Sequence, residues 1–209
     1  MNSRSGDAAF RLRNDQKLIA GWIPERARVL DLGCGDGALL AELMRSRGVT
    51  GYGLEIDTDN VARCIAAGVN VIQADLDEGL QAFEDHSFDV VIMTQTIQDV
   101  RYPDRLLTEM VRVGGEGIVT FPNVGHWKCR WQLMNGRMPV TASLPDSWFN
   151  TPNIHICTVR DFEALCAARS IEVIERTTVD ARHRPGLAMR FAPNLLGEVA
   201  IYRVKRRGT

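Results

Sequence analysis

Short apolar runs alternate with amphipathic segments along the first two thirds of the chain. The runs are of strand length and rich in Val, Ile and Leu, which is typical of strands buried on both faces. They predict strands over residues 28–32, 51–56, 69–74, 88–93 and 117–121. Between them, apolar residues recur at helical spacing, which predicts helices over 15–22, 38–47, 57–67 and after Pro103. This alternation predicts a mostly parallel sheet with helices on both faces.

The apolar residues of these helices define the faces expected to pack on the sheet. In 38–47 they are Leu39, Leu40, Leu43 and Met44, and Gly48 is the expected stop signal. In 57–67 they are Val61, Cys64 and Ile65. In the helix after Pro103 they are Leu106, Leu107, Met110 and Val111.

The alternation breaks after residue 122. Residues 123–157 hold several aromatic side chains and prolines, namely Trp127, Trp131, Trp148, Phe149, Pro139, Pro145 and Pro152. A helix then begins at Thr158, whose spacing to Asp161 resembles a capping box, and strands are predicted over 171–178 and 198–204. The sequence therefore predicts one domain over 1–209, a doubly wound, Rossmann-like α/β sheet of seven strands. An aromatic and proline-rich insert interrupts it at about 123–157.

Charge and cysteine content narrow the class of protein. The chain has 209 residues with 25 basic and 26 acidic side chains, and this balance argues against a constitutive nucleic-acid binder. Its five cysteines are odd in number and form no CxxC pair, so we expect reduced thiols and no metal site. The N-terminal residues have no secretory apolar region, and no apolar run approaches the ~20 residues of a membrane span. We therefore predict a cytoplasmic protein without membrane contact.

The segment VLDLGCGDG, residues 29–37, is the most informative motif. It follows the first strand, and parallel sheets bind ligands beyond the carboxyl ends of their strands. Gly33 and Gly35 allow a sharp turn and a close approach of the ligand. The spacing differs from the dinucleotide fingerprint GxGxxG and lacks the lysine of a phosphate loop. The flanking Asp31 and Asp36 disfavour a pyrophosphate and favour a cationic ligand.

Two further acids follow the next two strands. Glu55 ends the second strand, where a carboxylate can accept hydrogen bonds from both hydroxyls of a ribose. Asp75 ends the third strand and is placed to meet an exocyclic amine. A ligand with a cationic group, a ribose and an adenine fits these positions, and S-adenosylmethionine (SAM) is such a ligand.

These motifs together resemble the class I SAM-dependent methyltransferases. VLDLGCGDG resembles their first motif, GLEID (53–57) their second-strand acid, QADL (73–76) their adenine-side motif and SFDVV (87–91) the start of their fourth strand. The resemblance implies that SAM or S-adenosylhomocysteine (SAH) is the cofactor. The cofactor-binding residues that it implies are Asp31, Gly33, Cys34, Gly35, Gly37, Glu55, Ile56, Asp75, Leu76, Thr94 and Gln95.

No catalytic residue emerges from the sequence. The fourth strand runs into Thr94–Asp99 without the Asn/Asp-Pro-Pro-Tyr/Phe pattern of methyltransferases that act on nucleobases or glutamine. Gln98 cannot serve as a base, and Asp99 is a candidate, although an acid entering a loop is more often solvated. His126 is a second candidate, although a lone histidine beside a tryptophan is more often packed or hydrogen-bonded.

Segments of the insert resemble one particular family. The segments FPNVGHW, GRMPVT and TPNIH resemble those of the methionine biosynthesis protein MetW family, as does TQTIQ (94–98). This resemblance implies a role in methionine synthesis and a hetero-oligomer with a homoserine O-acyltransferase that depends on this partner for activity. Trp127, Trp131 and Trp148 are the expected interface, because aromatic residues and arginine are enriched at interfaces. The alternative is a lid over the cofactor, with the tryptophans as a local core.

Three functional hypotheses therefore remain open. The leading one is a SAM- or SAH-binding partner of homoserine O-acyltransferase, and the second is a SAM-dependent methyltransferase acting on an unidentified small molecule. The third is nucleic-acid binding, supported only by Arg182, Arg184, Arg190 and the basic tail 205–207, and basic tails are usually solvated. We expect no nucleic-acid partner.

Overall fold

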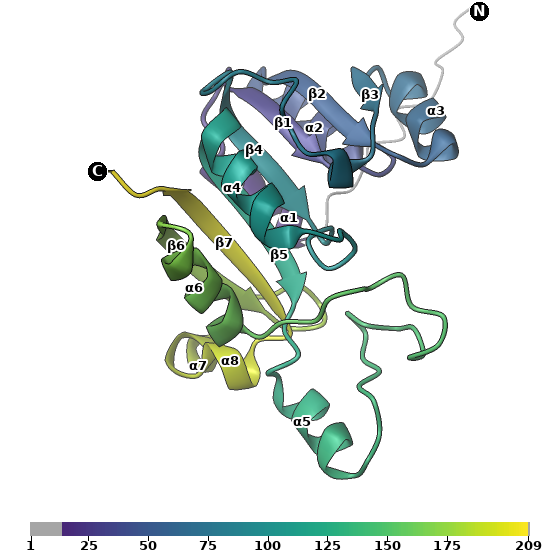
Figure 1. Ribbon diagram of the computed structural model, residues 1–209, viewed down its shortest axis with the longest axis vertical. Helices are drawn as coiled ribbons and strands as arrows, with labels where there is room; N and C mark the ends of the chain where they lie inside the picture. The colour runs from purple at the N-terminus through teal and green to yellow at the C-terminus, as the bar shows by residue number, and fades with distance from the viewer. Residues whose placement is uncertain (1–13, 209) are drawn as a thin grey trace, which may run out of the picture.

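The computed structural model describes residues 14–208, whose strands form one seven-stranded sheet with the order β3-β2-β1-β4-β5-β7-β6 (Figure 1). The first five strands pair in parallel, and β7 runs antiparallel to both β5 and β6. The strands are β1 (Arg28–Leu32), β2 (Thr50–Glu55), β3 (Val71–Gln73), β4 (Phe88–Thr94), β5 (Gly114–Pro122), β6 (Ile171–Val179) and β7 (Val199–Arg206). The predicted α/β class and the seven strands are confirmed.

Helices cover both faces of this sheet. Figure 1 shows α4 and α6 on the near face and α1 and α2 on the far face. The helices are α1 (Asn14–Trp22), α2 (Ala38–Arg47), α3 (Thr58–Ala66), α4 (Pro103–Val113), α5 (Trp127–Met134), α6 (Val159–Ala168), α7 (Leu187–Phe191) and α8 (Pro193–Leu196), with a 3₁₀ turn at Leu76–Glu78. The carboxyl ends of β1, β2, β3 and β4 meet at one edge because these strands are parallel.

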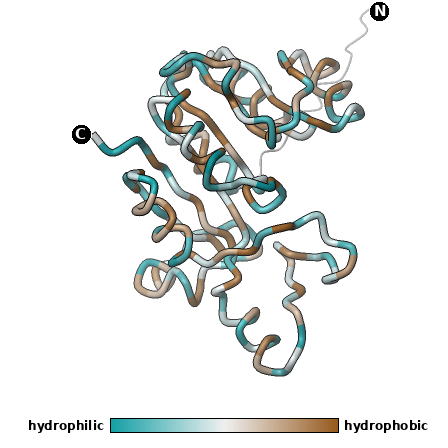
Figure 2. Tube along the Cα trace, in the orientation of Figure 1, coloured by the Kyte–Doolittle hydropathy of each residue, from teal (hydrophilic) through white to brown (hydrophobic). Residues whose placement is uncertain are grey.

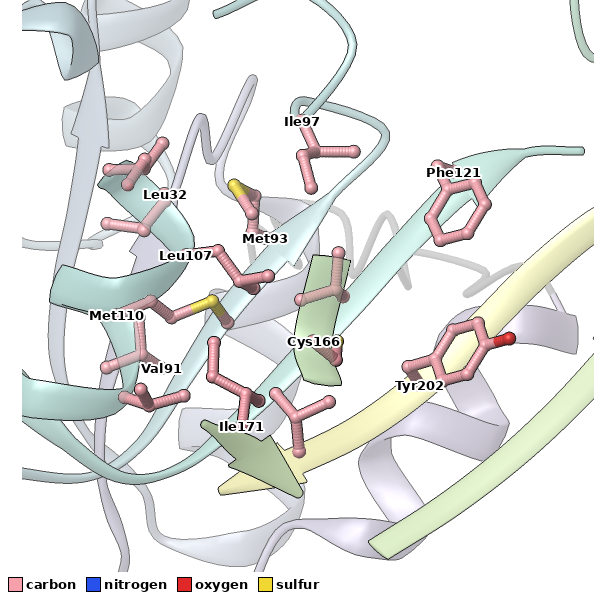
Figure 3. Close-up of a cluster of buried hydrophobic side chains, with 14 of the residues drawn as sticks. Leu32, Val91, Met93, Ile97, Leu107, Met110, Phe121, Cys166, Ile171 and Tyr202 are labelled. Carbon is pink, nitrogen blue, oxygen red and sulfur yellow. The ribbon is translucent and has the colours of Figure 1, made fainter. Parts of the chain in front are cut away.

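The apolar core has one layer on each face of the sheet. Figure 3 shows the layer beneath α4 and α6, where side chains of α4 and the neighbouring strands interdigitate. At its β5–β7 end, the ring of Phe162 lies 4.9 Å from Phe121 and 4.6 Å from Tyr202, measured between centroids. Burial of such large aromatic surfaces contributes strongly to stability, so this layer anchors the antiparallel end of the sheet.

Local sequence signals set several element boundaries. Helix α2 has the predicted bounds and ends at Gly48, whose φ of +65° is a left-handed conformation that glycine adopts readily. Helix α6 begins with the predicted capping box between Thr158 and Asp161. The apolar residues predicted to face the sheet from α4 are all buried.

The edge of the sheet departs from the prediction. The third strand covers only Val71–Gln73, and Ile65, expected to face inward from α3, is 66% exposed. Cys64 is the buried residue of that helix. The reason is the position of α3 at the end of the sheet beside this short strand, where the helix buries a narrower stripe.

The insert projects from the body of the molecule. In Figure 1, α5 and the following loop extend beyond the sheet, and the hydropathy trace of Figure 2 marks apolar positions along this projection. The insert is attached at its base by an isolated bridge between Asn123 and Cys157. It is also attached by Ile154 N and His155 N, which both donate to Gln98 O at 2.9 Å.

Candidate cofactor cleft and insert surface

The glycine turn connects β1 to α2 at the carboxyl edge of the sheet. Gly33, Gly35 and Gly37 have φ angles of +69°, +58° and +75°, a region that other residues adopt only with strain. The N–H groups of Gly33 and Cys34 both donate to Leu54 O, at 2.8 and 3.1 Å. The turn is therefore fixed against the end of β2.

The three positions differ in how much space they leave for a side chain. A Cβ at Gly33 would lie 2.6 Å from Thr96 Oγ1, and one at Gly37 would lie 2.9 Å from Cys64 Sγ. A Cβ at Gly35 would meet nothing within 4 Å. Packing thus explains Gly33 and Gly37, whereas Gly35 faces open space that a ligand can enter.

Glu55 ties the turn to the end of β2. Its buried carboxylate accepts from Gly35 N through Oε2 at 2.8 Å, and from Ile56 N and Asp57 N through Oε1 at 2.9 and 3.0 Å. Each carboxylate oxygen has two acceptor sites, so Oε2 keeps capacity for one further donor. The residue is both a structural anchor and an available acceptor.

The two acids that flank the turn lie in different environments. Asp31 is fully buried, and its Oδ1 has no hydrogen-bond partner in the structure. Burial, with a smaller contribution from the nearby Glu55 charge, raises the pKa of Asp31 to about 7. Asp36 is exposed, and its Oδ1 accepts from the N–H of Ala38, the first residue of α2, at 3.1 Å. That a cationic ligand pairs with these acids stays a prediction, and the buried Asp31 is the one whose charge lacks a hydrogen-bonding partner at Oδ1.

A cleft of about 420 Å³ opens beside the turn. The predicted residues that line it are Gly33, Glu55, Ile56, Asp75, Leu76, Thr94 and Gln95. Asp31, Cys34, Gly35 and Gly37 are not among its lining residues. Asp31 and Cys34 are buried, Gly37 packs against Cys64, and Gly35 is engaged through its N–H with Glu55. Asp75 Oδ1 accepts from Asp77 N at 2.9 Å, which caps the 3₁₀ turn.

The sequence reasoning missed several lining residues. They are Leu54, Ala74, Asp77, Thr96 and Val100, and Asp99, named from the sequence only as a candidate base, also lines the cleft. The segment after β4 could have been found by the rule that located Glu55 and Asp75, since it also follows a parallel strand at the same edge.

Of the two candidate bases, only one lines the cleft. Asp99 lies in the wall of the cleft, and burial raises the pKa of its carboxyl group. His126 is buried beside Trp127, with ring centroids 5.7 Å apart, and is not among the residues that line the cleft. Burial lowers the pKa of His126. The expectation of a packed histidine at position 126 is borne out.

The tryptophans of the insert are exposed. Trp127, Trp131 and Trp148 are 49%, 63% and 74% exposed, and no residue of 123–157 lines the cleft. They form neither a local core nor a lid over the cleft. Met134, Phe149 and Ile154 are similarly exposed nearby in the chain, so the insert carries an apolar surface without a covering element among the described residues.

Two further predictions concern metals and membranes. Within residues 14–208, no group of three or more His, Cys, Asp or Glu side chains is arranged to hold a metal ion. None of the helices in this range is both long and apolar enough to cross a membrane.

Comparison with known proteins gives consistent results. Residues 13–204 match the family model described as methionine biosynthesis protein MetW. A relative from Rhodopirellula baltica, the bifunctional methionine biosynthesis protein MetXA/MetW, is 34% identical over 200 residues, which is 91% of this chain. The match covers 32% of that relative, so the chain spans about a third of its length.

Solved structures share the fold. A SAM-dependent methyltransferase from Mesorhizobium loti superposes with a TM-score of 0.69 at 17% identity, covering 95% of this chain and 100% of that one. A possible histamine N-methyltransferase from Thermotoga maritima gives 0.66 at 20% identity, covering 93% and 88%. A phosphoethanolamine N-methyltransferase from Haemonchus contortus, solved with SAH, gives 0.69 at 16% identity, covering 93% and 53%. These superpositions show that the chain has the class I methyltransferase fold.

Proposed function

The chain belongs to the methionine biosynthesis protein MetW family, and we propose that it is a SAM- or SAH-binding partner of homoserine O-acyltransferase. In this proposal the cleft beside the glycine turn binds the cofactor. The insert contacts the acyltransferase, which requires this contact or is regulated through it.

The polar groups of the cleft fit the cofactor. Oε2 of Glu55 has acceptor capacity for a ribose hydroxyl beyond its bond to Gly35 N. Asp75 lines the same cleft and suits the exocyclic amine of adenine. The unpartnered Oδ1 of Asp31 lies under the turn, where a cationic group of the ligand would offset the cost of a buried carboxylate. Gly35 leaves the space that such a ligand needs.

The observation that carries the partner assignment is the bifunctional relative. Its name joins MetXA and MetW in one chain, and the present chain matches about a third of its length. Two activities fused in one relative are often separate, associating proteins elsewhere, and we take the MetXA part to be the homoserine acyltransferase. The exposed apolar surface of the insert supports this assignment, since large exposed apolar patches mark interaction sites.

The test is a reconstitution of the purified pair. The cognate homoserine O-acyltransferase is assayed with and without this protein, and association is followed by size-exclusion chromatography. We expect a joint peak and a higher rate of acyl transfer. Separate peaks together with an unchanged rate would refute the partner role.

Asp99 favours a second candidate function, methyl transfer from SAM to an unidentified small molecule. A carboxylate with a raised pKa in the cleft wall is suited to take a proton from an acceptor. The test is SAH formation in a metabolite screen, with Asp99→Asn as the control. Turnover that Asp99→Asn lowers at least tenfold would support it, and turnover unaffected by the substitution would remove Asp99 from that role.

A further inference from the structure

A second polar cavity, of about 330 Å³, lies between the start of the insert and the β6–β7 connection. None of its lining residues also lines the cleft beside the glycine turn. Its charged side chains are Lys128, Asp180, Arg182, Arg184 and Glu198. Its volume is at the lower end of the range for small-molecule sites, about 300–1,000 Å³.

Glu198 is a buried acid at this cavity, and it forms an ion pair with Lys128 but no hydrogen bond to the described residues. The side chain is 4% exposed, and its Oε1 has no hydrogen-bond partner in the structure. The nearest cation is Lys128, whose Nζ lies 3.8 Å from Oε2, beyond hydrogen-bond distance. A buried carboxylate without hydrogen bonds is destabilising, so this site holds a negative charge that lacks donors.

Arg182 provides the opposite charge. Its side chain is exposed, and no ion pair or hydrogen bond of its guanidinium group occurs among the described residues. The neighbouring acid Asp180 is already engaged, since its Oδ1 accepts from Arg182 N at 2.9 Å and Arg184 N at 2.8 Å. Its Oδ2 lies 3.4 Å from Arg184 Nη2. The cavity therefore presents a buried carboxylate whose Oε1 lacks a donor, and a guanidinium group without a partner among the described residues.

The remaining lining is suited to a neutral side chain. Trp127 and Leu196 contribute apolar surface. His126 is buried, its Nδ1 has no partner in the structure, and burial lowers the pKa of the ring. A neutral imidazole nitrogen can accept a hydrogen bond from an ammonium group.

We propose that this cavity binds a free α-amino acid with an uncharged side chain. The ammonium group binds Glu198 with His126 beside it, the carboxylate binds Arg182 and Lys128, and the side chain packs against Trp127 and Leu196. This site goes beyond the cofactor cleft and the partner surface of the proposed function, and it gives the protein a second small-molecule ligand.

The experiment is isothermal titration of the full chain with L-methionine as the probe, in saturating SAH so that the first cleft is filled. Two blocked compounds test the two charges separately: N-acetyl-L-methionine lacks the ammonium group and L-methioninamide lacks the carboxylate. We expect L-methionine to bind, and both blocked compounds to bind at least tenfold more weakly.

Two variants test whether Glu198 and Arg182 form the binding site. Glu198→Gln keeps the shape of the side chain and removes its charge, and Arg182→Gln alters an exposed residue, so both should fold. Each should weaken L-methionine binding at least tenfold. Glu172→Gln is the matched control, because Glu172 pairs with Lys205 on the exposed β6–β7 surface and should leave binding unchanged.

The outcomes separate this inference from the proposed function. Absence of L-methionine binding, or binding unchanged in both Glu198→Gln and Arg182→Gln, overturns the inference even where SAH binds normally. Failure of SAH to bind contradicts the proposed cofactor role instead. In that case the titrations of the two variants with L-methionine still test the second site on their own.

Discussion

The glycine turn and the insert differ in how much the rest of the protein contacts their characteristic residues, the glycines and the tryptophans. Around the turn, the backbone of Gly33, Cys34 and Gly35 is held by hydrogen bonds to Leu54 and Glu55. In the insert, Trp131 and Trp148 are mostly exposed. The turn has a shape that its contacts with β2 determine, whereas the insert leaves apolar surface uncovered.

This difference indicates two separate tasks. Exposed large apolar side chains gain nothing for the isolated chain and favour association, because burying them removes apolar surface from water. A rigid polar cleft is instead suited to a small ligand with fixed hydrogen-bonding groups. Substitutions in the cleft should therefore leave the association with the acyltransferase unchanged, and substitutions in the insert should leave SAH binding unchanged, whereas occupancy of the cleft can still alter the rate of the associated pair.

The largest effect is expected from the double substitution Trp131→Asp and Trp148→Asp. Placing two charges in the proposed interface should weaken binding of the acyltransferase by about 4 kcal/mol or more, the range of strong interface residues. Biolayer interferometry with the immobilised acyltransferase measures this. Ile65→Asp is the matched control, since Ile65 is 66% exposed and Trp131 63%, but Ile65 lies on α3 outside the insert. Equal losses in both variants would contradict the interface assignment.

The next effect is expected from Gly35→Val. The new side chain fills the open space at this position and should weaken SAH binding by about 3 kcal/mol, the upper end of the cost of overpacking. Gly68→Val controls for backbone strain, because Gly68 also has a positive φ and open space around its Cβ. Calorimetric titration with SAH compares the two. A Gly35→Val protein that binds SAH like the Gly68→Val protein would show that the cleft is wrongly assigned.

Glu55→Ala should have a smaller effect on SAH binding, about 1.5–3 kcal/mol for loss of a charge-assisted hydrogen bond. It should also lower the free energy of unfolding, because the N–H groups of Gly35, Ile56 and Asp57 lose their acceptor. Titration with SAH and urea denaturation measure the two effects. Binding of the acyltransferase should not change, and a parallel loss there would mean that the two regions are coupled.

The smallest effect is a pH dependence that originates at Asp31. Its pKa of about 7 lies above the ordinary value of 3.8, so the side chain is mostly neutral below pH 7 and charged above it. A cationic ligand prefers the charged form, so the affinity for SAM should fall about tenfold from pH 8 to pH 6. In Asp31→Asn this part of the pH dependence should disappear. A wild-type profile that is flat or inverted would contradict the pairing with a cation.

The raised pKa of Asp31 also has a consequence for stability. The folded state binds this proton more tightly than the unfolded state, so the Asp31 contribution to stability is present below about pH 4 and is lost as pH rises to about 7. The ligand-free protein should therefore resist urea better at pH 5 than at pH 8, and Asp31→Asn should reduce this difference.

Local signals made much of the fold predictable. Gly48 and the Thr158–Asp161 pair set helix ends through interactions within a few residues, which sequence spacing reveals. Glu55 and Asp75 could be placed at the cleft because parallel strands end at one edge of the sheet. Helix α4 was predictable because its apolar stripe is broad and fully buried.

Features that depend on distant contacts were not predictable. The need for glycine at position 33 comes from Thr96, and at position 37 from Cys64. The exposure of Ile65 depends on the position of α3 at the end of the sheet. The cavity between His126 and Glu198 joins residues from two distant parts of the sequence. The partners of His183 and His155, namely Asp15 Oδ2 at 3.4 Å and Arg101 O at 3.3 Å, also lie far along the chain.

The most direct test of the account is the rate of acyl transfer by the cognate homoserine O-acyltransferase, with this protein present and absent, titrated with SAM. We predict that the wild-type protein raises the rate and that SAM changes the rate of the pair. Gly35→Val should still raise the rate but remove the response to SAM, and the double tryptophan variant should fail to raise it. A rate that is the same with and without the wild-type protein would contradict the account.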